Sequence, residues 1–326
     1  MANTLSLRDW LARIDEEYLS SFIRDGGASI KFVVTPDVLQ AELEEAVSHR
    51  CRELDCLFVK FDAATLRAHM PQDLFFALAR RIDWRRTARR LILSLAAGAR
   101  YRTEGLDASA EGNIFDAIAA ANGLERQFVL QALRPAVQER VFRNRKLVRD
   151  FRVAMTALCQ QEESCEGAEY AGEALLNWLT GHNPRVSSIR PIPIYTSINR
   201  TTARYFVESA LHWLRDAGYS GTVLVLDNRR VTVARNPRDG ARYYTRAMAM
   251  DHYELLREFV DDVDRLAGTL MLVTTGEGFL DDDARGKGFG IYEALKARVM
   301  DDVHDRNLVN PVASLVRLSR EGRHDG

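Results

Sequence analysis

The chain has 326 residues, of which 46% are hydrophobic and 28% are charged, with 45 basic against 46 acidic side chains. This composition is typical of a soluble globular chain that is large enough to fold without disulfides or metals. A net charge of −1 excludes a global field that would attract the chain to DNA or to an anionic membrane, so any such affinity must come from a local patch.

The cysteines and the N-terminal stretch predict a cytoplasmic protein. Cys51, Cys56, Cys159 and Cys165 are few for this length and fit reduced thiols. A zinc site is the alternative, but the C-x4-C and C-x5-C spacings are wider than the usual C-x2-C knuckle. Residues 1–18 are polar and acidic, unlike a secretory signal, and no apolar run approaches the ~20 residues of a membrane span.

The first elements predict a strand–helix–strand unit. Apolar residues recur at helical spacing over 7–24, and the β-rich run 30–34 indicates a buried strand. A second helix is expected at once, because Thr35 suits the N-cap, Pro36 suits the first helical position and Asp37 suits the helix dipole.

A second buried strand is predicted over 56–61, which completes a βαβ unit and implies a parallel sheet. From Gln72 to about Gly181 the pattern is almost wholly helical, and a proline-rich linker follows over 182–195. Strand and helix patterns then alternate again. Helices are predicted over 199–217, 251–266 and 289–303, and strands over 222–226, 269–274 and 312–318. The predicted sections are 1–70 (α/β), 71–185 (helical insertion) and 186–326 (α/β).

Four stretches along this frame carry a resemblance to a known family. They are YLSSFIRDGGASIKFVV, WLRDAGYSGTVLVLDN, GFLDDDARGKGFGIYEALKARV and NPVASLVRL. In this order they resemble segments of the bacterial P-loop ATPase family associated with BREX-type phage defence systems. The resemblance covers residues 15–60 and 199–318. It implies an α/β fold, a P-loop NTPase-like doubly wound parallel sheet with a large all-helical insertion, in a protein that works in a multi-protein defence system.

The chain departs from that family where the resemblance places the nucleotide. Thr35-Pro36-Asp37 replaces the glycine-rich loop with its Gly-Lys-Thr or Gly-Lys-Ser, and Pro36 has no N–H for a phosphate. Asp227 keeps the magnesium-binding position, but Asn228 replaces the acidic residue that orients water, and an amide accepts no proton. The family's C-terminal helical lid is expected to be absent, since the chain stops at Gly326. These departures predict a degenerate, non-hydrolysing site.

Two arginines match positions of the family's block after the sensor-like strand. Arg285 and Arg298 are predicted to contact the nucleotide of a neighbouring subunit. The alternative is a salt bridge to one of the three aspartates at 281–283. The neighbouring Gly286–Gly290 segment lacks the glycine spacing and the Ser/Thr of a phosphate loop, so a flexible loop is expected there.

A basic run opens the predicted insertion and suggests contact with nucleic acid. Its members are Arg80, Arg81, Trp84, Arg85, Arg86, Arg89 and Arg90. The arginines would contact phosphates, and Trp84 would stack on a base. A second basic stretch consists of Arg140, Arg143, Arg145, Lys146, Arg149 and Arg152. The alternative for both is a solvated helix face paired with nearby acids.

These observations predict a non-catalytic subunit without a cofactor or a metal. It would scaffold or regulate a partner ATPase, helicase or methyltransferase of a bacterial defence system, with DNA contact through the insertion and no membrane contact. The alternative is a divergent ATP-binding protein or weak ATPase, in which Lys31, Asp227 and Arg285 serve; ATP and magnesium belong only to this alternative.

Overall fold

The computed structural model divides the chain into two compact units, Met1–Leu74 with Tyr219–Gly326, and Phe75–Gly218. The second unit includes the helix expected over 199–217, which the sequence pattern had placed with the α/β section. No helix among the described residues is long and apolar enough to cross a membrane. The structure describes residues 3–163, 169–233, 235–236, 240–241, 243–283, 285–300 and 312–320.

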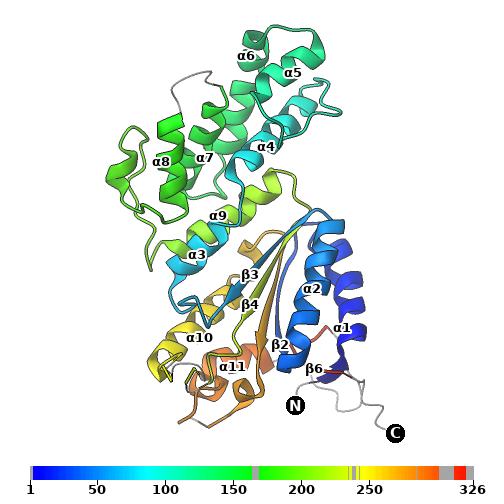
Figure 1. Ribbon diagram of the computed structural model, residues 1–326, viewed down its shortest axis with the longest axis vertical. Coiled ribbons are helices and arrows are strands. Elements are labelled where there is room, and N and C mark those ends of the chain that lie inside the picture. Colours follow the sequence, from blue (N-terminus) through cyan, green and yellow to red (C-terminus); the bar gives the residue numbers. More distant parts are fainter. Residues whose placement is uncertain are drawn as a thin grey trace. The chain divides into compact units, whose positions relative to one another are not determined.

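The first unit is built on a six-stranded, all-parallel sheet with the strand order β1-β6-β2-β5-β4-β3 (Figure 1). Its strands are β1 (Asn3–Ser6), β2 (Ala28–Val34), β3 (Cys56–Asp62), β4 (Gly221–Asp227), β5 (Thr269–Thr275) and β6 (Leu315–Ser319). This arrangement confirms the predicted P-loop NTPase-like α/β fold. The sequence predicted five of these strands and missed β1, whose four residues, NTLS, are too few and too polar to give a strand pattern.

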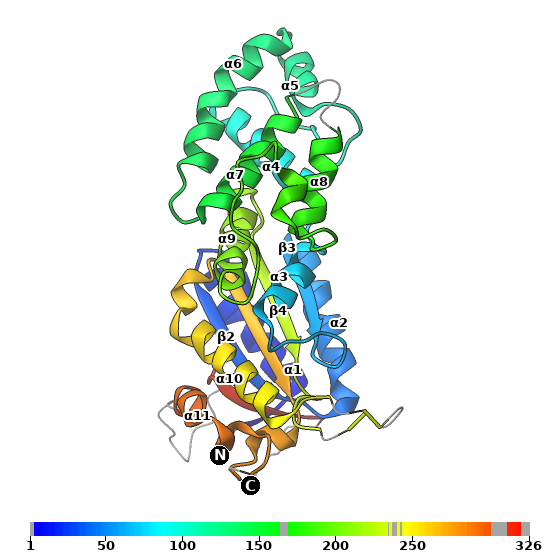
Figure 2. The ribbon, with the colours of Figure 1, turned by 90° about the vertical axis from the view of Figure 1, so that its left-hand side faces the viewer.

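Helices cover both faces of the sheet, as a doubly wound fold requires (Figure 2). On one face Trp10, Leu43 and Val225 belong to a single buried core. On the other face the ring of Phe279 stacks on Phe32 and meets Tyr253 edge-on. The helices of this unit are α1 (Leu7–Ile14) with a π-helical continuation (Asp15–Phe22), α2 (Asp37–Glu53), α10 (Arg246–Asp261) and α11 (Glu293–Met300).

Between β3 and β4 the described residues form seven α-helices. They are α3 (Pro71–Ala79), α4 (Trp84–Gly98), α5 (Ile114–Asn122), α6 (Arg126–Val137), α7 (Arg149–Gln161), α8 (Glu169–Leu179) and α9 (Ala203–Asp216). Phe206 lies at the centre of the second unit, where its ring meets those of Phe75, Phe151 and Trp178. This aromatic core gives the helices a buried interior of their own.

Local signals explain where several of these helices begin and end. The Asp83 side chain accepts the backbone N–H of Arg86, which starts α4. The Asn113 side chain starts α5 in the same way, and Gly123 ends that helix with a φ of 63°. Glycine adopts this left-handed conformation without strain.

Candidate functional site

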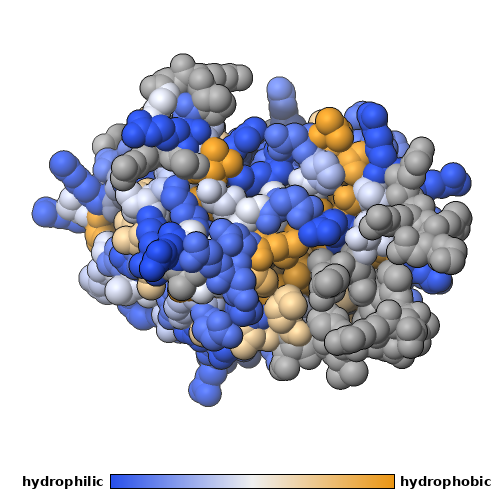
Figure 3. Space-filling model, turned by 90° about the horizontal axis from the view of Figure 1, so that it is seen from below, coloured by the Kyte–Doolittle hydropathy of each residue, from blue (hydrophilic) through white to orange (hydrophobic). Residues whose placement is uncertain are grey.

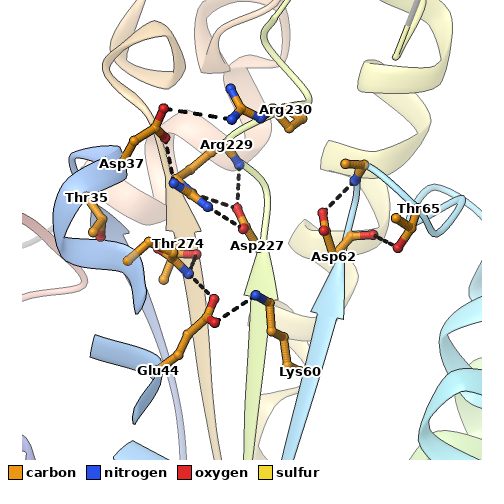
Figure 4. Close-up of polar contacts among 12 residues, drawn as sticks. Thr35, Asp37, Glu44, Lys60, Asp62, Thr65, Asp227, Arg229, Arg230 and Thr274 are labelled. Atoms are coloured by element: carbon orange, nitrogen blue, oxygen red, sulfur yellow. Dashed lines mark hydrogen bonds and ion pairs between the residues drawn. The ribbon is translucent and has the colours of Figure 1, made fainter. Parts of the chain in front are cut away.

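The candidate site lies at the edge of the sheet where the parallel strands end (Figure 4). Asp227, the last residue of β4, is in register with Asp62 of β3 and Thr274 of β5. Residues in register on neighbouring parallel strands share a face of the sheet, so these three side chains lie side by side. Asp37 begins α2 directly after β2 at the same edge. The structure therefore brings Asp37 and Asp227 together.

The start of α2 corrects one prediction. Pro36, with an extended backbone, occupies the N-cap position, and the helix begins at Asp37. Thr35 does not cap the helix: its backbone N–H donates to the carbonyl oxygen of Thr275 at 2.8 Å, and its hydroxyl donates to Val33 O at 3.3 Å. The bond to β5 keeps Thr35 in the extended conformation of β2, so its side chain points away from the helix N–H groups.

A guanidinium group that the sequence analysis did not single out lies between the two carboxylates. Arg229 Nε and Nη2 donate to Asp227 at 2.9 and 2.7 Å, and Nη1 donates to Asp37 (Figure 4). Arg230 Nη2 lies 3.8 Å from Asp37 Oδ2. Burial lowers the pKa of Arg229, but its hydrogen bonds to Asp227 and the negative charges raise that pKa more, so the net direction is upward. We call Asp37, Asp227 and Arg229 the carboxylate corner.

A second chain of polar contacts runs along the same face, farther from the strand ends. Lys60 Nζ donates to Glu44 at 2.7 Å, and Gln40 Nε2 donates to Glu44 at 2.6 Å and to Thr274 Oγ1 at 3.0 Å (Figure 4). These contacts join β3, α2 and β5. They hold α2 against the sheet and thereby fix the position of Asp37.

Asn228 is buried, with 3% of its surface exposed. Its backbone N–H donates to Thr274 O at 2.7 Å, but neither its amide nitrogen nor its amide oxygen has a hydrogen-bond partner among the described residues. An unpaired buried amide costs roughly 1–3 kcal/mol. Asn228 is thus a polar group beside the carboxylate corner that a ligand could satisfy, although it cannot accept a proton from water.

The carboxylate corner does not fit ATP with magnesium. Phosphate binding at a helix N-terminus needs free N–H groups and a cation, but Pro36 has no N–H and Asp37 places a carboxylate there. Asp227 already binds Arg229, which a magnesium ion would have to displace. Lys31 does not supply the missing charge, because its Nζ donates to Val312 O and lies 4.7 Å from the centre of the Tyr18 ring. That contact contradicts a phosphate-binding role for Lys31.

Arg285 and Arg298, which match the family's block after the sensor-like strand, have different surroundings. Arg298 pairs with Asp261, with Nη2 to Oδ2 at 3.2 Å, and not with any of the aspartates at 281–283. Lys296 pairs with Asp282 instead, at 2.8 Å. Arg285 is exposed, and its side chain makes no hydrogen bond or ion pair with the described residues. A subunit contact therefore stays a prediction, and Arg285 is the better placed of the two.

Arginine side chains of the basic run bond other groups of the second unit. Trp84 is only 3% exposed and donates to Ala79 O at 2.9 Å, so the expected stacking of Trp84 on a base is wrong. Arg89 is 4% exposed and bonds Glu162 at 2.7 Å, and Arg85 bonds the other oxygen of that carboxylate at 2.8 Å.

Two further members of the run bond backbone carbonyl groups. Arg90 donates to the carbonyl oxygens of Ala217 and Gly218 at 3.0 and 2.8 Å, and Arg80 donates to Thr180 O at 2.9 Å. Arg81 and Arg86 are exposed. Arg80 and Arg85 are exposed as well, so the run forms a partly solvated face whose bonded arginine side chains also hold helices and loops together.

The cysteines described by the structure are buried free thiols at positions 51, 56 and 159. Burial raises the pKa of each, to about 11 for Cys56 and to about 12 for Cys159. Cys165 lies outside the described residues. Within the described part of the chain, no three His, Cys, Asp or Glu side chains come together as metal ligands.

Hydrophilic residues predominate among the coloured residues seen from below, and a smaller orange apolar area lies beside them (Figure 3). Val38, the residue after Asp37, is 67% exposed and contributes an apolar side chain next to the carboxylate corner.

Comparison with protein families gives a match. A family model described as BREX system ATP-binding protein BrxC/D matches residues 87–322. The matched segment contains β4 with Asp227, β5 and β6, but it begins within α4, after β2, α2 and β3. No curated protein and no solved structure matches the chain.

Proposed function

The chain belongs to the BREX system ATP-binding protein BrxC/D family, and on that premise we propose that it is a non-hydrolysing subunit of a BREX defence complex. In this proposal the ATPase-like fold serves as a scaffold or regulator of a partner ATPase, helicase or methyltransferase. One observation carries the proposal: Arg229 joins Asp227 to Asp37 at the place where the family resemblance puts magnesium and phosphate.

The charges of the carboxylate corner support this proposal. Both carboxylates already have a cationic partner, so the place of the metal ion is taken by a side chain of the same molecule. Catalysis of phosphoryl transfer depends on a lysine, a metal ion and a group that positions water. Neither Pro36 nor Asn228 supplies such a group, and Lys31 is engaged elsewhere.

A second candidate function is nucleotide binding without hydrolysis, and the unpaired amide of Asn228 favours it. The two functions make different predictions for a thermal melt. A ligand with a Kd of 10 μM, present at 1 mM, stabilises the folded state by about 2.7 kcal/mol. If the carboxylate corner is closed to ATP, 1 mM Mg-ATP should leave the melting temperature unchanged, and no phosphate should be released.

The matched controls for this melt are Asp227→Ala and Asp62→Asn. The Asp62 carboxylate lies at the same edge but accepts the backbone N–H of Ala64 at 2.8 Å, so it should not affect a nucleotide. A stabilisation by Mg-ATP that disappears in Asp227→Ala and persists in Asp62→Asn would establish the second candidate and contradict our proposal.

The scaffold role is testable at Arg285, which is exposed and free of side-chain bonds within the described chain. We expect Arg285→Glu to reduce the amount of partner ATPase that co-purifies with this protein from cells that carry the complete defence system. Arg52→Glu is the control, since Arg52 is an exposed arginine of α2 on the same unit. Equal recovery of the partner with both variants would remove Arg285 from the contact.

A further inference from the structure

Two hollows on the second unit share Tyr195 as a lining residue. One has a volume of about 500 Å³ and is lined by Arg149, Tyr195 and Tyr205, among others. The other has a volume of about 260 Å³ and is lined by Arg190, prolines and Tyr195. Because Tyr195 belongs to both, the two hollows are neighbours, and we treat them as the two halves of one surface feature. We call it the tyrosine groove.

The two tyrosines of the groove are unusually accessible for aromatic residues. Tyr195 is 73% exposed and Tyr205 is 41% exposed. A guanidinium group lies over each ring: Arg149 Cζ is 5.1 Å from the ring centre of Tyr195, and Arg204 Cζ is 5.1 Å from that of Tyr205. A planar group can stack on the part of each tyrosine ring that the guanidinium group leaves exposed.

The segment that carries Tyr195 is held in place by a buried carboxylate. Asp150 is 3% exposed and accepts the backbone N–H groups of Tyr195, at 2.9 Å, and of Thr196. Arg149 bonds the same carboxylate and also donates to Pro193 O at 3.2 Å. Burial raises the pKa of Asp150, but these donors lower it more, so the carboxylate stays charged. The donors of the same unit neutralise this charge. They also hold the backbone of Tyr195 in place in the absence of a ligand.

Basic side chains border the groove. Arg190 is exposed in the smaller hollow. Arg145 and Lys146 are exposed in the segment just before Val148, which lines the larger hollow, and the Arg145 side chain makes no bond with the described residues. An anionic chain would therefore find positive charge at both ends of the groove. Arg145 and Lys146 belong to the second basic stretch of the sequence, which takes no part in the carboxylate corner.

We propose that the tyrosine groove binds single-stranded nucleic acid, with bases stacked on Tyr195 and Tyr205 and phosphates near Arg190 and Arg145. Stacking needs bases whose faces are free, which a duplex does not offer, and a phosphate chain matches the charge of the border. An acidic peptide would satisfy the arginines but has no planar groups for two tyrosine platforms. The inference stands on residues of the second unit and is independent of the carboxylate corner.

The experiment is fluorescence anisotropy with labelled dT20, labelled rU20 and a 20-base-pair duplex, at 50 and 200 mM NaCl. Removing one stacking platform with Tyr195→Ala should weaken binding of the single strands roughly 5- to 150-fold. Tyr195→Trp should restore it, because the ring is kept. Arg190→Glu should also weaken binding and should reduce its dependence on salt, whereas Tyr195→Ala should leave the salt dependence unchanged.

Two further variants separate this site from others. Phe128→Ala removes an aromatic side chain of α6 that is 59% exposed outside the groove, and it should bind as the wild type does. Arg81→Glu with Arg86→Glu tests the exposed part of the first basic run. If the Arg81→Glu and Arg86→Glu double variant lost binding while Tyr195→Ala kept it, the binding site would lie at the start of α4, and the inference would be overturned. Equal loss for duplex and single strands, or no binding of dT20 at 50 μM protein, would also overturn it.

Discussion

Replacing Arg89 by alanine is expected to lower the free energy of unfolding of the second unit by about 3–5 kcal/mol. Arg89 and Glu162 are 4% and 5% exposed, and their side chains bond at 2.7 Å. Arg89 also donates to Ala110 O at 2.6 Å and to Gly112 O. Without the guanidinium, the Glu162 carboxylate keeps only the more exposed Arg85, and the carbonyl groups of Ala110 and Gly112 lose their donor. The large effect follows from an uncompensated buried charge.

A denaturant titration followed by tryptophan fluorescence measures this loss, because Trp84, Trp178 and Trp213 lie in the second unit. Arg86→Ala is the matched control: it removes an exposed arginine of the same helix and should change stability by less than about 0.5 kcal/mol. The double variant Arg89→Met with Glu162→Gln should recover part of the loss, since no charge is left buried. A loss below about 1 kcal/mol in Arg89→Ala would show that Glu162 is solvated.

Arg229→Ala is expected to lower the free energy of unfolding of the first unit by about 3 kcal/mol. Asp227 is 3% exposed and loses its two side-chain hydrogen bonds from Arg229, keeping the bond from the backbone N–H of that residue. Its charge then stays in the protein without a counter-ion. Asp37 keeps only the distant Arg230. Urea-dependent hydrogen exchange of the backbone amides of β4 and β5, which belong to the first unit, measures the change.

Two comparisons make this second prediction specific. Arg230→Ala removes a half-exposed arginine 3.8 Å from Asp37 and should cost less than about 1 kcal/mol. Asp227→Asn in the Arg229→Ala background should restore stability, because it removes the stranded charge. If Arg229→Ala and Arg230→Ala proved equally mild, the carboxylate corner would be an exposed ion pair, and the main support for a closed nucleotide site would be lost.

The sequence predicted most of the sheet, because strand and helix periodicity are local properties of the chain. The buried runs at 30–34, 222–226 and 269–274 all lie inside observed strands. Three of the four segments that resemble the family contain β2, β4 and part of β6, and Asp227 ends β4 as expected. The start of α2 was misplaced by one residue, since a hydrogen bond from Thr35 to β5 decides it and β5 is more than 200 positions away.

The site residues were harder to predict, because their roles depend on partners that only the fold brings together. Arg229 follows a strand-ending aspartate, and nothing in that spacing indicates that it also reaches Asp37, 192 positions earlier. Trp84 and Arg89 look like a basic, aromatic nucleic-acid motif in the sequence, yet both are buried. Tyr195 looks like a linker residue, yet it stands exposed between two hollows.

The sequence by itself therefore determined the α/β frame and the family, since both rest on residues that are neighbours along the chain. Only the tertiary structure decided what fills the carboxylate corner, which arginines are internal and which tyrosines are accessible. Burial and charge pairing are properties of surroundings, and those surroundings are assembled from segments that lie far apart in the sequence.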